Sequence, residues 1–208
     1  MLSILHFARI GSGTVIVLGA LIFLIILLCG EQLVGWDPTW RAFGVTPLQP
    51  HFFDMHVPLD YATCAAKGFD PYIPHSCNVA NFNIPPVWLW LSVLGLTSSD
   101  AAWLSIAITA AALAVMVILF KNRSVTDGII ALIAILSPSV LMGVERGNPD
   151  LLILAIVGAA ALVYADKILG RSSGAVALIA LGIILKLFPT FCVALAARSI
   201  DERCCLPL

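Results

Sequence analysis

Two long apolar runs constrain this chain more than any other feature. Gly11 to Gly30 and Ala101 to Phe120 contain no charged residue, and a membrane-spanning helix needs about 20 mostly apolar residues. The whole chain is 61% hydrophobic and only 11% charged, which is typical of integral membrane proteins rather than soluble domains. Lipid offers no hydrogen bonds to an open backbone, so spans of this kind are helical. We therefore predict an all-α polytopic membrane protein with about five to six transmembrane helices and interfacial helices in a large first outer loop.

The spacing of polar and apolar residues divides the chain into successive elements. We expect residues 1–208 to form a single membrane domain. Lys186, with Pro189 close behind it, interrupts the last apolar stretch and indicates a broken helix or a helix pair. The expected elements are helix 1 over 10–33, an outer loop over 34–100, helix 2 over 101–120, helix 3 over 127–144, helix 4 over 150–166 and the broken element over 173–198.

The basic residues predict an orientation in the membrane. They precede the first helix, follow the second and separate the fourth from the fifth, at Arg9, Lys121, Arg123, Lys167 and Arg171. Because cytoplasmic loops are enriched in Lys and Arg, the amino terminus is expected inside. Residues 31–100 and 145–150 then lie on the outer side. Within the outer loop, residues 54–67 and 85–96 can form helices along the membrane surface. The second of these segments is too short to span the membrane.

A short polar cluster lies between two uncharged apolar runs. Its sequence is Glu145-Arg146-Gly147-Asn148-Pro149-Asp150. A charge buried in hydrocarbon costs roughly 2.5 to 3.5 kcal/mol even on lenient scales, so such groups usually face a polar cavity, pair with one another or bind a ligand. The alternative is a simple helix-connecting turn, because Gly-Asn-Pro is turn chemistry.

The outer loop and this cluster together offer the groups that a transfer reaction requires. Asp54 could cap a surface helix, or it could act as a general base toward an attacking hydroxyl. The guanidinium of Arg146 could hold phosphate oxygens in a bidentate manner. Lys186 could add a second positive charge.

The remaining polar residues exclude other classes of site. His51, His56 and His75 lack the tight spacing of metal ligands, even with Cys77 added, so we predict no metal and no cofactor. A net charge of −1 without a basic patch predicts no nucleic-acid partner. Cys64 and Cys77 both fall in the outer loop, where a disulfide between them is an open alternative.

Five short motifs in a fixed order resemble a known group of enzymes. They are Asp54 followed by Pro71-Tyr72, then Asn83-Ile84-Pro85-Pro86, Ser137-Pro138, Glu145-Arg146-Gly147-Asn148-x-Asp150, and Lys186-Leu187-Phe188-Pro189. This set, over about residues 10 to 197, resembles the multi-pass glycosyltransferases of superfamily C, and most of all glycosyltransferase family 87, which includes polyprenol-phosphate-mannose-dependent mannosyltransferases.

The resemblance implies a function and a site. An enzyme of this kind moves a sugar, with inversion, from a polyprenyl-phosphate donor to a hydroxyl of a lipid or glycan acceptor. Asp54 would be the catalytic base. The substrate-binding residues would be Arg146 and Lys186 near the donor phosphate, Asn148 and Asp150 around the pocket, and Glu145 and Tyr72. The expected location is a bacterial cell membrane, surrounded by membrane lipids, with the active side outward.

Two departures from the pattern leave other interpretations open. Ile84 stands where the family motif has a tyrosine, and the family is typically longer than this chain. The tail over 199–208 is atypical of a membrane protein and suggests a truncated or frameshifted product. The alternatives are a transporter or flippase fragment that binds an anionic lipid through Arg146 and Lys186, and an inactive membrane remnant.

Overall fold

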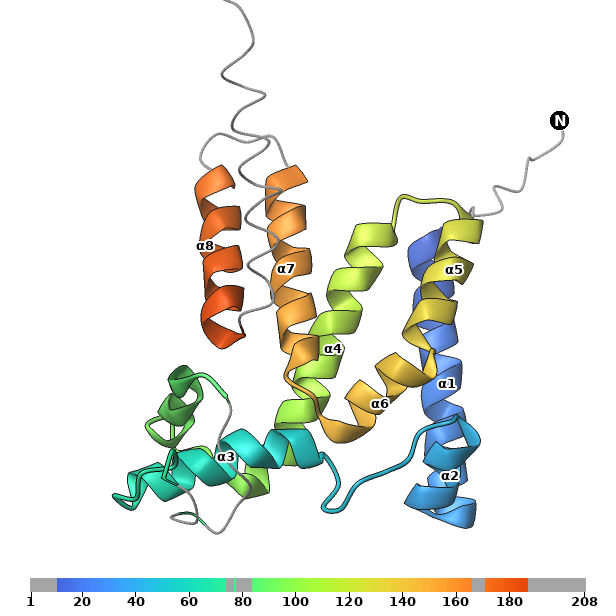
Figure 1. Cartoon of the computed structure of the whole chain (residues 1–208). Helices are drawn as coiled ribbons and strands as arrows, with labels where there is room; N and C mark the ends of the chain where they lie inside the picture. Colours follow the sequence, from blue (N-terminus) through green and yellow to red (C-terminus); the bar gives the residue numbers. More distant parts are fainter. Residues whose placement is uncertain (1–10, 74–76, 78–83, 166–170, 187–208) are drawn as a thin grey trace, which may run out of the picture. The chain divides into compact units, whose positions relative to one another are not determined.

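The computed structural model describes residues 11–73, 77, 84–165 and 171–186, and all regular structure in these segments is helical (Figure 1). The prediction of an all-α membrane fold is confirmed. Expectations that fall on His75, Asn83, Pro189 and the tail over 199–208 lie outside the described residues. The helices are α1 (Ser12–Val34), α2 (Trp36–Ala42), α3 (Phe53–Ala66), the 3-10 helices η1 (Pro86–Ser92) and η2 (Ser98–Asp100), α4 (Ala101–Phe120), α5 (Val125–Ile135), α6 (Pro138–Arg146), α7 (Asp150–Ala165) and α8 (Arg171–Leu185).

The chain forms two compact units. The first comprises residues 1–46 and 116–142, and within it α1 packs along α5. Glycines permit the close approach, because a Cβ on Gly19 would overlap the side chain of Leu132 and one on Gly128 would lie 2.8 Å from the Cα atom of Ser12. α5 begins with a capping box in which Ser124 and Asp127 each satisfy a backbone N–H group of the other.

The second unit comprises residues 47–115 and 143–208, and it contains the candidate site. Met55 and Leu59 of α3 are buried against Ala101 at the start of α4. Farther along α4, Ala112 packs against Leu151 and Ala155 of α7. Within this unit α3 therefore lies across the amino-terminal end of α4, and α7 lies beside α4 (Figure 1).

The ends of α7 and α8 determine where charged groups gather. These two helices pack side by side and run in opposite directions (Figure 1), so the start of α7 at Asp150 lies near the end of α8 at Leu185. Carboxylates are stabilised at helix amino termini and cations at carboxyl termini. Asp150 and Lys186 therefore both occupy electrostatically favourable positions.

Two described helices are long and apolar enough to cross a membrane, namely α1 and the continuous stretch Ser98–Phe120. A third candidate span is the pair α5 and α6, which is bent by 55°. The sequence predicts one helix over 127–144, whereas the structure breaks it at Leu136 and Ser137. Pro138 explains the break: it lacks an N–H donor, disfavours helical backbone in the residue before it and begins α6. α7 and α8 are shorter apolar helices.

A disulfide closes the loop after α3. Cys64 and Cys77 are bonded, with their Cα atoms 5.9 Å apart. This bond ties the carboxyl-terminal end of α3 to the segment that follows, so the alternative left open by the sequence is resolved in favour of a bridge.

Candidate active site

Residues 145–150 connect α6 to α7, and hydrogen bonds fix the conformation of this connection. The N–H of Asn148 donates to the carbonyl of Gly143 at 2.8 Å, and that of Gly147 to the carbonyl of Val144 at 3.1 Å. These two bonds form the Schellman arrangement that ends a helix at a left-handed residue. Asn148 then caps α7: its side-chain oxygen accepts from the N–H of Asp150 at 2.9 Å. The segment therefore does form a helix-connecting turn. This role uses the oxygen of the Asn148 side-chain amide but not its nitrogen.

Gly147 allows this connection to pack closely on its surroundings. Its φ of 63° lies in the left-handed region, where glycine is favoured. A Cβ at this position would overlap the Oγ of Ser105 on α4 and would lie 3.2 Å from the Cβ of Met55 on α3. The absence of a side chain thus brings the segment against both helices.

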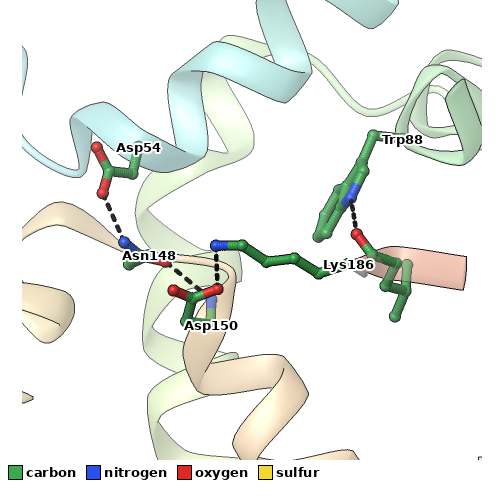
Figure 2. Close-up of polar contacts among 6 residues, drawn as sticks. Asp54, Trp88, Asn148, Asp150 and Lys186 are labelled. Atoms are coloured by element: carbon green, nitrogen blue, oxygen red, sulfur yellow. Dashed lines mark hydrogen bonds and ion pairs between the residues drawn. The ribbon is translucent and has the colours of Figure 1, made fainter. Parts of the chain in front are cut away.

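The other half of the Asn148 amide reaches Asp54. Its Nδ2 donates to the Asp54 Oδ2 at 2.9 Å (Figure 2). Because the amide oxygen is occupied by Asp150 and the amide nitrogen by Asp54, both bonds select the same orientation of the Asn148 side chain. A residue in the first turn of α3 is thereby joined to the start of α7.

Asp54 is not the cap of its helix. The capping position is Phe52, whose φ of 60° is left-handed, and no side chain caps this end. Asp54 follows in the first turn, half-buried, where the helix dipole favours a carboxylate. Burial raises the pKa of Asp54 above its ordinary value, while the charge of Arg146 and the Asn148 hydrogen bond oppose that rise.

Two cations lie near this carboxylate. Lys186 forms an ion pair with the Asp150 carboxylate, and both side chains point into the same region as Asp54 (Figure 2). The two side chains are 44% and 45% exposed, and an exposed pair of this kind contributes only about 0–1 kcal/mol. Arg146 acts on Asp54 electrostatically, and its buried Nε finds no hydrogen-bond acceptor among the described residues.

The geometry thus gathers two carboxylates, one amide and two cations from the start of α3, the connection from α6 into α7, and the residue that follows α8. Among the described residues, no group of three or more His, Cys, Asp or Glu side chains is arranged to hold a metal ion. The sequence model of glycosyltransferase family 87 matches residues 83–203, which is more than half of the chain. The chain belongs to glycosyltransferase family 87. No curated protein and no solved structure matches it.

The family match gives the class of the protein and covers part of the sequence that forms the site. This family 87 protein is a membrane glycosyltransferase by family, and the matched residues include the 145–150 segment and Lys186. Asp54 precedes the matched region, so its connection to the site comes from the Asn148 hydrogen bond.

Glu145 and Tyr72 are also predicted substrate-binding residues of this glycosyltransferase, but one is buried and the other lies in a separate turn. Glu145 is fully buried, and its Oε1 accepts from the backbone N–H of Leu48 at 3.3 Å. It therefore anchors the segment that leads into α3. Tyr72 is exposed in a turn beyond the far end of α3, where its N–H donates to Asp70. α3 has 14 residues and is therefore about 20 Å long. This length separates the end that carries Asp54 from the end that leads to Tyr72.

Some residues that shape the site carry no sequence signal of that role. Ser105 lies under Gly147 within an apolar helix, and Leu48 holds Glu145 through its backbone. Trp88 is a third case. The tryptophans of η1 are of a type that suits the lipid headgroup level, yet Trp88 is buried, whereas Trp90 is exposed.

Proposed function

We propose that this protein transfers a sugar, with mannose as the first candidate, from a polyprenyl-phosphate donor to a hydroxyl acceptor at the outer face of a membrane. The observation that carries the proposal is the hydrogen bond that holds the Asp54 carboxylate to Asn148, beside the positive charges of Arg146 and Lys186. The family match supports the glycosyltransferase class. The resemblance of the motifs to mannosyltransferases that use polyprenyl phosphate supports the donor.

The proposed reaction is a single displacement. The acceptor hydroxyl oxygen attacks the anomeric carbon, the bond from that carbon to the phosphate oxygen breaks, and the configuration at the carbon is inverted. The Asp54 carboxylate takes the hydroxyl proton, and polyprenyl phosphate leaves with the bonding electrons. Asn148 donates to Oδ2 of Asp54, so Oδ1 is the oxygen that would accept the proton.

The two cations suit the negative charge on the donor and on the leaving group. The buried Nε of Arg146 has no hydrogen-bond acceptor among the described residues, which is costly unless a ligand supplies one, and a guanidinium binds phosphate oxygens in a fork. The exposed ion pair of Lys186 with Asp150 is weak enough for a phosphate to displace the carboxylate. Both groups would stabilise the phosphate as its charge increases in the transition state.

Replacing Arg146 by glutamine should raise the KM for the lipid-linked donor by about 10-fold or more, because a hydrogen bond to a charged group contributes about 1.5–3 kcal/mol. Steady-state transfer in detergent micelles measures the effect. Lys67→Gln, which removes an exposed cation at the other end of α3, is the matched control. An unchanged KM in Arg146→Gln would contradict the assignment of Arg146 to the donor phosphate.

The pH dependence of kcat/KM should report the environment of Asp54. A base must be deprotonated, so activity should fall as the pH drops through its pKa, which burial places above the ordinary value of about 3.9. The Asn148 hydrogen bond lowers that pKa, so Asn148→Ala should move the acid limb to higher pH. Asp150→Asn should move it to lower pH, because the charge of Asp150 raises the pKa. An acid limb that moves in the reverse direction in either variant would contradict the assignment of Asp54 as the base.

The orientation is part of the same proposal. Disulfides persist in oxidising compartments outside the cytoplasm, so the Cys64–Cys77 bond supports an outward-facing α3, in agreement with the distribution of basic residues. In intact bacterial cells, a membrane-impermeant maleimide should label these two thiols only after reduction. The double variant Cys64→Ser/Cys77→Ser should lose that additional labelling. Labelling of the pair only after the membrane is permeabilised would contradict an outward site.

A further inference from the structure

Trp88 connects η1 to the end of α8. Its side chain is only 5% exposed, and its Nε1 donates to the backbone carbonyl of Leu185 at 3.1 Å (Figure 2). Leu185 is the last residue of α8, and the carbonyls of a final helical turn have no partner within the helix. The indole thus serves as a cap on α8 from a distant part of the sequence.

The capped residue directly precedes Lys186. The N–H of Lys186 closes the helix on the carbonyl of Gly182 at 2.9 Å, and the Lys186 side chain then extends to Asp150 (Figure 2). A lysine side chain has many rotamers, and a shift of the backbone that carries it adds further variation to the position of its ammonium group. A fixed backbone removes that second source of variation. In this structure the Trp88 hydrogen bond holds the adjoining carbonyl.

η1 also contacts the helix that carries the proposed base. It packs along α3, which begins beside Asp54, as well as touching α8. The same short helix therefore contacts the element that carries the carboxylate and the element that leads to the cation.

We propose that Trp88 is a positioning residue that holds Lys186 in its place beside Asp150, where the lysine binds the donor phosphate. This inference rests on the proposed function and adds a residue that the motifs do not assign to the site. The indole acts through the end of α8 and does not itself contact the substrate.

Trp90 provides a matched control on the same 3-10 helix. It lies two residues beyond Trp88, and its side chain is 68% exposed. Trp88→Phe and Trp90→Phe remove the same N–H donor and the same part of the ring. The two variants differ in whether that donor holds α8.

The experiment is a double-mutant cycle in which the KM and kcat for a polyprenyl-phosphate sugar are measured. Trp88→Phe should raise KM by about 2- to 10-fold, the equivalent of one lost hydrogen bond, with a smaller change in kcat, while Trp90→Phe leaves both constants near wild type. In the Lys186→Gln background, Trp88→Phe should raise KM little further, because its effect passes through the lysine. Trp88→Tyr is a second variant that keeps a large aromatic ring and should behave like Trp88→Phe.

The possible failures of this experiment are distinguishable. Transfer by the wild type with equal KM values in Trp88→Phe and Trp90→Phe would overturn the role of Trp88 alone. An equal rise in KM with and without Lys186 would show that Trp88 acts independently of the lysine, which also overturns the inference. Absence of transfer from any lipid-linked donor by the wild type would contradict the proposed function itself.

Discussion

Replacing Asp54 by asparagine should lower kcat by about 10²- to 10⁴-fold, the range that a positioned general base contributes. Asparagine has nearly the same shape and its side-chain oxygen still accepts from Asn148, so the contact that joins α3 to α7 is preserved. The variant loses the negative charge at this position and with it the capacity to take the hydroxyl proton. Transfer from the lipid-linked donor, measured beside detergent gel filtration of the same sample, separates lost chemistry from lost folding.

Asp60→Asn is the control for this variant. Asp60 lies on the same helix and accepts a hydrogen bond from Ser98, which an asparagine oxygen can also accept. Its activity should remain near that of the wild type. If Asp54→Asn retains wild-type turnover while folded, Asp54 is not the base.

Replacing Gly147 by valine should destabilise the site by roughly 2–6 kcal/mol, which combines left-handed backbone strain and overpacking. The φ of 63° is unfavourable for a β-branched residue, and its Cβ would overlap Ser105 and approach Met55. Total stabilities of about 5–15 kcal/mol make this a large loss. The expected results are a lower thermal unfolding midpoint in detergent and transfer reduced by at least 10-fold.

Gly143→Ala tests whether the effect is specific to Gly147. A Cβ on Gly143 would lie 3.9 Å from its nearest neighbours, which is ordinary contact, and alanine favours a helix interior. This variant should match or exceed wild-type stability. A Gly147→Val protein that unfolds at the wild-type temperature and transfers sugar normally would contradict the packing of this connection.

The sequence allowed the long helices to be predicted, because an uncharged run of spanning length has few alternatives to a helix in lipid. α1 and α4 follow that pattern. The bend before Pro138 was not expected, because a proline inside an apolar run can either kink a helix or begin a new one. Packing against neighbouring residues determines which of these occurs.

The site was predictable only in part. The 145–150 segment stands out by charge, and Lys186 by its isolation in an apolar stretch. Asn148 and Asp54 are 94 positions apart, so their hydrogen bond depends on the way α3 crosses the end of α4. Trp88 was not predicted for the same reason, since its partner is a backbone carbonyl, which every residue possesses.

The most direct test of the account is a comparison of sugar donors. The purified chain in proteoliposomes receives radiolabelled mannose either on polyprenyl phosphate or on a nucleotide, each with a lipid or glycan acceptor extract. We predict that label reaches the acceptor from the polyprenyl-phosphate donor, with an inverted anomeric configuration, and not from the nucleotide sugar. Transfer from the nucleotide sugar with none from the lipid-linked donor would contradict it.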